Sequence, residues 1–243
     1  NSFYTLLNHG TMTISDGVEV NQGLNGNAQF SSLVENGWYN GKQKPAGAAE
    51  PKLTINGGEF IGGLNTIKND DYGVLEINGG AFTKAAQAAV LNWNQATIKD
   101  GIFVSSQSCV LNGKIDDSMD KGELTISGGK FKARTVVGRM DSRYDFGSVE
   151  ITDGTFSGYF GEQIDGMKVS GGTFAFAPDA KYLASGFTLV KNADGTFGVK
   201  ETPKVAEVDG TKFETVSDAV AAANGKTVKL LENVKEDVIV RMG

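Results

Sequence analysis

The chain has 243 residues, of which 40% are hydrophobic, 33 are glycine and only four are proline, a composition typical of an all-β protein with many turns. The formal net charge is −6 and the basic residues form no cluster, so we expect no nucleic-acid partner. A single cysteine, Cys109, excludes an internal disulfide, and no apolar stretch approaches the roughly 20 residues that cross a bilayer, so we expect no membrane insertion.

A short motif recurs seven times along the first three quarters of the chain. Each copy has an apolar–polar–apolar strand followed by a glycine step and, in six copies, a phenylalanine, as in Leu-Thr-Ile-Asn-Gly-Gly-Glu-Phe at 53–60. The copies span 12–19, 53–60, 75–82, 96–103, 124–131, 149–156 and 167–174. Self-similarity at this period is the signature of a solenoid. The motif predicts an all-β fold, a right-handed parallel β-helix over residues 1–175.

The phenylalanines of the motif are expected to point inward and to stack on one another, because alternate residues of a strand face the core. The predicted stack contains Phe60, Phe82, Phe103, Phe131, Phe156 and Phe174. In the first copy Glu19 stands in place of the aromatic residue. The first gap between copies is 41 residues, which predicts two coils and a missing copy near 30–38.

A column of Asn and Asp residues precedes the motif by four positions. It consists of Asn8, Asp71, Asn92, Asp120 and Asp145. Such side chains bond their own backbone two residues on, so the column predicts Asx turns that start each strand. Apolar segments at 4–7, 33–34, 90–91, 110–111 and 136–137 predict one further strand per coil.

The motif ends at Phe174, and a different pattern follows. Residues 176–200 predict a short helix and a β-hairpin that close the solenoid. Residues 201–243 predict a small β-α-β unit, a cap or the start of a following module, with strands at 206–208, 227–231 and 238–240. Its helix is expected at 216–223, where apolar residues share one face and Asn-Gly follows.

Two kinds of side chain are candidates for a site, and none is assigned a catalytic role. Asp120 and Asp145 occupy matching places in neighbouring coils, about 4.8 Å apart along the solenoid, and so are candidate calcium ligands. However, asparagine fills the same column, which favours turn formation over a metal site. We therefore predict no cofactor, with calcium as the alternative. The only histidine, His9, excludes a site built on several histidines.

Aromatic residues outside the phenylalanine column are the candidate ligand-binding residues. They are Trp38, Tyr39, Tyr72, Trp93 and Tyr144. Exposed aromatic rings stack on sugar rings while Asn, Gln and Asp bond the hydroxyl groups, so this set predicts shallow glycan recognition. The alternative interpretation is that Trp38 and Trp93 cover the edges of coils.

The last third of the chain resembles a known family. Residues 174–199, with Pro178, Tyr182-Leu183-Ala184 and Asp194-Gly195, resemble the segment that closes β-helical domains in large surface proteins of gut Firmicutes. Residues 208–233 are similar to the unit that opens a following β-helix in those proteins. The resemblance implies an extracellular, multidomain, adhesin-like protein, often attached to the cell wall. The pectate-lyase-like superfamily and bacteriophage fibres share the expected fold.

The sequence thus predicts a non-catalytic, secreted or cell-surface module of a bacterium. It would be a rigid β-helical stalk that presents loops, especially 20–52 and 112–122, to glycans or to host and cell-surface proteins. One alternative is a polysaccharide lyase or glycoside hydrolase of the β-helix type. Another is a component of a bacteriophage fibre or spike on the virion surface. The oligomeric state is left open.

Overall fold

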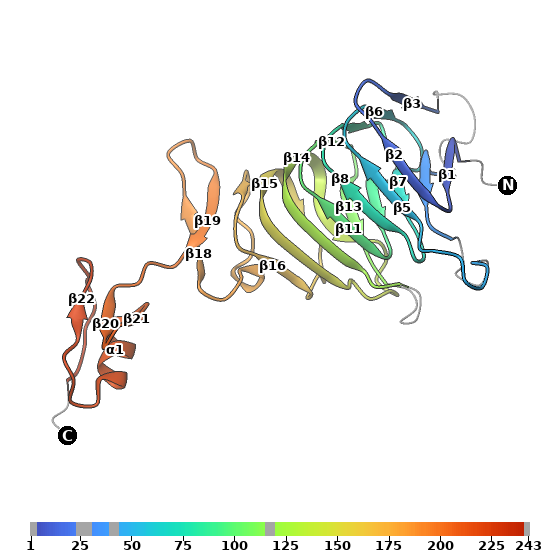
Figure 1. The fold of residues 1–243 in the computed structure, drawn as a ribbon. Coiled ribbons are helices and arrows are strands. Elements are labelled where there is room, and N and C mark those ends of the chain that lie inside the picture. The colour runs from blue at the N-terminus through green and yellow to red at the C-terminus, as the bar shows by residue number, and fades with distance from the viewer. Residues whose placement is uncertain (1–3, 23–30, 39–43, 115–119, 241–243) are drawn as a thin grey trace. The chain divides into compact units, whose positions relative to one another are not determined.

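The computed structural model describes residues 4–22, 31–38, 44–114 and 120–240, and it forms two compact units. The first contains residues 1–185 and 189–200, and the second contains residues 186–188 and 201–243. The coils of the first unit follow one another from blue to yellow in Figure 1. Its parallel strands wind about 307° round an axis, which confirms the predicted fold class of a parallel β-helix.

Each coil contributes strands to three parallel ladders. The first ladder contains β2 (Thr11–Ile14), β5 (Lys52–Ile55), β8 (Val74–Ile77), β11 (Gln95–Ile98), the starts of β14 (Glu123–Arg139) and β15 (Ser148–Phe160), and β16 (Met167–Val169). The second contains β3 (Glu19–Asn21), β6 (Glu59–Ile61), β9 (Ala81–Thr83), β12 (Ile102–Val104), the middle of β14 and of β15, and β17 (Thr173–Phe174). The third contains β1 (Leu6–Asn8), β4 (Val34–Asn36), β7 (Asn65–Asn69), β10 (Ala88–Asn92), β13 (Ser108–Asn112) and the ends of β14 and β15.

The predicted phenylalanine stack forms the centre of the core. The six rings from Phe60 to Phe174 lie 4.7–5.0 Å apart between centroids and within 9° of parallel. All six are buried. In the first coil, Val20 rather than Glu19 occupies this column, because β3 pairs Val20 with Phe60 and Glu19 with Glu59. The sequence places Glu19 in the column because the first turn, Ser15 to Val18, is one residue longer than the later ones.

The long first gap holds one coil and not two. β2 pairs directly with β5, so no copy of the motif is missing between them. The segment near 30–38 instead supplies β4, which lies between β1 and β7 in the third ladder. The interval is long because both connections around β4 are long.

An asparagine ladder runs through the last residue of the third-ladder strands. Asn8, Asn36, Asn69, Asn92 and Asn112 are in register on successive coils. Each of the first four side-chain amides donates Nδ2–H to Oδ1 of the next asparagine, over 2.7–2.8 Å, and Asn112 Nδ2 donates to Gly122 O and Phe146 O. All five are buried.

The predicted Asn/Asp column therefore mixes two positions. Asn8 and Asn92 belong to the ladder, whereas Asp71, Asp120 and Asp145 lie in the turns that follow it. Asx bonding itself occurs at both kinds of position: Gly10 N donates to Asn8 Oδ1 over 3.1 Å, and Gly147 N donates to Asp145 Oδ1 over 3.0 Å.

The parallel order stops at the end of the first unit. β17 pairs antiparallel with β19 (Phe197–Glu201), which follows β18 (Phe187–Lys191) through a turn at 192–196. A 3₁₀ turn, η2 (Ala180–Tyr182), lies between β17 and β18, as the sequence predicts. An antiparallel partner satisfies the backbone groups that a further coil would otherwise bind.

The second unit is a small αβ fold. β20 (Ala206–Val208) pairs antiparallel with β21 (Thr211–Phe213) and with β22 (Lys229–Leu230). The helix α1 (Val216–Ala223) begins after Thr215, whose hydroxyl accepts from Asp218 N, and ends at Asn224 in the left-handed conformation. The strand predicted at 238–240 is not formed: that segment has no strand partner, and Ile239 and Val240 are exposed.

Candidate ligand-binding groove

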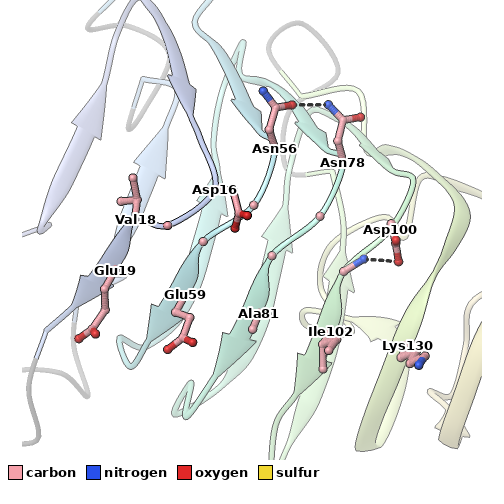
Figure 2. A pocket seen from close by; sticks show the side chains of 16 residues that line it. Asp16, Val18, Glu19, Asn56, Glu59, Asn78, Ala81, Asp100, Ile102 and Lys130 are labelled. Atoms are coloured by element: carbon pink, nitrogen blue, oxygen red, sulfur yellow. Dashed lines mark hydrogen bonds between the residues drawn. The ribbon is translucent and has the colours of Figure 1, made fainter.

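A groove runs along the outside of the corner between the first and second ladders. It has a volume of about 830 Å³, crosses the glycine steps of four coils and reaches Lys130 of a fifth. Figure 2 shows these turns side by side. Glycine is required here: Gly58 has φ +98°, and a Cβ on it would lie 2.6 Å from the Val18 carbonyl oxygen. Because glycine pairs carry no side chains, the corner stays open to a ligand.

One wall of the groove is a row of outward-facing residues on the second ladder. Glu19, Glu59, Ala81, Ile102 and Lys130 are in register on successive strands, as Figure 2 shows. The row is therefore acidic at one end, apolar in the middle and basic at the other end.

The opposite side of the groove carries amides and further carboxylates. Asn78 Nδ2 donates to Asn56 Oδ1 over 2.9 Å at the surface, where Asn56 is exposed and Asn78 is half-buried. Asp100 Oδ1 accepts from Gly101 N over 2.7 Å, and Asp16 lies beside Gly57. These groups offer hydrogen-bond donors and acceptors that repeat about every 4.8 Å along the solenoid. Such an arrangement suits an extended ligand with many hydroxyl groups.

The described residues contain no group of three or more His, Cys, Asp or Glu that is arranged to hold a metal ion. Asp120 is buried, whereas Asp145 is exposed and bonds Gly147 N. The backbone of Asp145 also pairs with Lys114, over 2.9 and 3.2 Å. The two calcium candidates thus differ in environment although they occupy matching turns. No helix in the described part of the chain is long and apolar enough to cross a membrane.

Four of the five aromatic candidates lie in the described residues, and each is engaged by protein. Trp93 is only 4% exposed and meets Tyr144 edge to face at 5.5 Å in a cluster with Leu91 and Leu111. Trp38 stacks on His9, with ring centroids 3.8 Å apart. Tyr72 is half-buried, and the Lys44 ammonium lies 5.1 Å from its ring centroid. Tyr39 lies outside the described residues. Trp93 is therefore part of the packing and not a free surface for a ligand. This agrees with the alternative interpretation, in which Trp93 covers the edge of a coil.

A buried charged group lies on the third ladder, away from the groove. The Lys68 ammonium bonds Asp70 and lies 4.0 Å from the Glu35 carboxylate, which is 0% exposed. Burial raises the pKa of Glu35 to about 7, although the Lys68 charge lowers it. In the core, burial also raises the pKa of Cys109 to about 12, which keeps this thiol protonated at neutral pH.

Two exposed aromatic residues are not among the candidates that the sequence predicts. Tyr159, in β15, and Phe176, just after β17, stack on each other with ring centroids 4.1 Å apart. They belong to neighbouring coils, and the strong phenylalanine column hides them in the sequence. Their position is the only signal in the sequence. Each lies two or three residues after the core phenylalanine of its coil, and the other coils have no aromatic residue at that place.

The fold and the groove define a class, a parallel β-helical solenoid with an open polar corner. Comparison of the chain with family models, with curated proteins and with solved structures found no match.

Proposed function

We propose that the chain is a non-catalytic extracellular binding module, a stiff β-helical stalk that holds glycans in the groove at its glycine corner. The observation that carries the proposal is the groove that crosses the glycine steps of four coils, reaches Lys130 of a fifth, and is lined by carboxylates and amides. Carboxylates accept hydrogen bonds from sugar hydroxyls, amides both donate and accept, and Ala81 and Ile102 offer apolar contact to C–H groups. A long shallow groove suits a polysaccharide better than a compact metabolite.

A surface location and an adhesin-like role complete the proposal. They are supported by the resemblance of residues 174–199 and 208–233 to segments of large surface proteins of gut Firmicutes. A rod whose coils are held by stacked rings and a buried amide ladder is suited to presenting a binding face away from a cell. Host or cell-surface glycoproteins are then the expected partners.

The test is binding of the labelled full chain to an array of polysaccharides, followed by affinity measurement for the best ligand. The double variant Asn56→Ala/Asn78→Ala removes two amides that line the groove and should weaken binding about tenfold. Gln95→Ala is a matched control, because this exposed amide bonds Glu123 Oε2 over 2.6 Å outside the groove. Equal affinity of all three proteins for every bound polysaccharide would refute the groove as the site.

Glycoside hydrolysis is a second candidate, favoured by one observation. Glu19 and Glu59 are in register on neighbouring strands, so the backbone positions that carry their two side chains lie about 4.8 Å apart. Retaining glycosidases use two carboxyl groups about 5 Å apart. Release of reducing ends from neutral and uronic polysaccharides, with and without calcium, separates the two functions. Turnover that Glu59→Gln abolishes would replace the non-catalytic proposal.

A further inference from the structure

We propose a second carbohydrate site at the other end of the solenoid, where the stacked Tyr159–Phe176 pair and an adjacent cleft receive one or two neutral sugar rings. The cleft has a volume of about 310 Å³. None of its lining residues lines the groove, so this inference does not rest on the function proposed for the groove.

The pair is unusual among the aromatic residues that the structure describes because it is exposed. Tyr159 is 58% exposed and Phe176 is 45% exposed, whereas the six rings of the core stack are buried. The two rings are inclined by only 21° with centroids 4.1 Å apart, so they stack face to face across two coils. Each ring covers one face of the other, and the surface that remains exposed on the pair is called the platform here. An exposed ring face carries partial negative charge and attracts the weakly positive C–H groups of a sugar ring.

The wall behind the platform is held in place by packing. Phe160 contacts Phe156 and Phe174 at 6.3 and 5.8 Å between centroids, and it meets Tyr182 edge to face at 6.2 Å. The Lys181 ammonium lies 4.9 Å from the Tyr182 ring centroid. The cleft is thus pre-formed, which lowers the entropic cost of binding a small ligand.

Polar side chains surround the platform. Glu162, Gln163, Asp179 and Lys181 line the cleft and are exposed. Gln163 has φ +54°, a conformation that non-glycine residues rarely adopt and that is concentrated at functional sites. Apolar ring faces next to carboxylates, an amide and an ammonium match a pyranose, which has a C–H face and a rim of hydroxyl groups. Two carboxylates against one ammonium leave the cleft with a net negative charge, which favours a neutral sugar over an anionic one.

The experiment titrates the full chain with two- and three-ring gluco-, galacto- and manno-oligosaccharides by isothermal calorimetry. We expect one configuration to bind, and Tyr159→Ala and Phe176→Ala each to weaken it about tenfold or more. Tyr159→Phe, which keeps the ring, should bind within about twofold of the native chain. Because both rings are exposed, the unfolding midpoints of the variants should match the native value.

The groove variant Asn56→Ala/Asn78→Ala separates the two sites. It should leave the binding of short oligosaccharides unchanged if the platform holds them. The inference is overturned if no short oligosaccharide binds the native chain, or if the two alanine variants bind as the native chain does. Loss of binding in the groove variant alone would overturn the platform and support the groove, whereas binding at the platform with an inert groove would refute only the proposed function of the groove.

Discussion

The asparagine ladder should contribute much more to stability than its exposed counterpart in the groove, and Asn69 is the residue to test. Its Nδ2 donates to Asn92 Oδ1 over 2.8 Å, to Gly73 O over 3.0 Å and to Gln95 O over 2.9 Å. Its Oδ1 accepts from Asn36 Nδ2 over 2.8 Å. The side chain is fully buried, so no water replaces these partners when it is removed.

The expected loss for Asn69→Ala follows from which partners keep another bond. Asn36 Nδ2 still donates to Val74 O over 3.1 Å, and Gly73 O still accepts from Asn94 Nδ2 over 2.9 Å. Asn92 Oδ1 loses its ladder donor. One buried group left unpaired costs about 1–3 kcal/mol and each of the three other lost bonds about 1 kcal/mol, so the free energy of unfolding should fall by about 4–6 kcal/mol.

The matched control is Asn78→Ala. Asn78 makes the same kind of amide–amide bond to the neighbouring coil, over 2.9 Å, but at the exposed surface. Its removal should change the free energy of unfolding by less than about 0.5 kcal/mol. Urea unfolding followed by circular dichroism measures both values. A loss below about 1 kcal/mol for Asn69→Ala, or equal losses for both variants, would refute the role given to the buried ladder.

Three further predictions concern the interior. Phe103→Ala should cost about 3–5 kcal/mol in urea unfolding, because it leaves a cavity between Phe82 and Phe131, and a loss near that of an exposed truncation would contradict a packed stack. The pKa of Glu35 is raised from 4.5 to about 7, so its contribution to stability is fully present below pH 4.5 and is lost as pH rises through 7. At pH 8, Glu35→Gln should therefore be more stable than the native chain by up to about 3 kcal/mol and should unfold at a higher temperature. At pH 5 the two proteins should unfold at similar temperatures. A less stable variant at pH 8 would show that the Lys68 charge outweighs burial. Because burial raises the pKa of Cys109 to about 12, the thiol should react with a disulfide reagent at pH 8 only after urea is added, and rapid labelling of the native chain would disprove this.

The core could be predicted from the sequence because each coil repeats it in the same order. An apolar–polar–apolar strand, a glycine step and a phenylalanine place every ring directly above the previous one, so one period determines the whole stack. Helix 216–223 was also predictable, because Thr215 and Asn224 mark its two ends and the apolar residues lie on one face.

The asparagine ladder was only partly predictable, for a geometric reason. The connection between a ladder asparagine and the next strand varies in length: it is residues 93–94 in one coil and residues 37–51 in another. Counting back from the motif by a fixed number therefore aligns Asp71 and Asp145 with Asn92. The pattern apolar–any–Asn, present at Val34–Asn36, Ile67–Asn69 and Val110–Asn112, gives the correct alignment.

The groove and the aromatic platform were not predicted because each is made by several coils. The groove depends on glycine pairs that leave a corner empty, and the sequence shows these only as turn signals. Tyr159 and Phe176 come together because Phe156 and Phe174 are in register, and no local pattern links them. Conversely, Trp93 is a prominent residue in the sequence, but burial removes it from the surface.

The buried ladder also determines where this protein can change without unfolding. Each asparagine fixes the register of its coil before the chain leaves the third ladder, so an insertion made just after it does not shift the strands that follow. The chain already uses this freedom, since the segments 37–51, 113–122 and 140–147 all leave from that corner. New loops could be grafted there one coil at a time, which makes the corner a natural position for engineering.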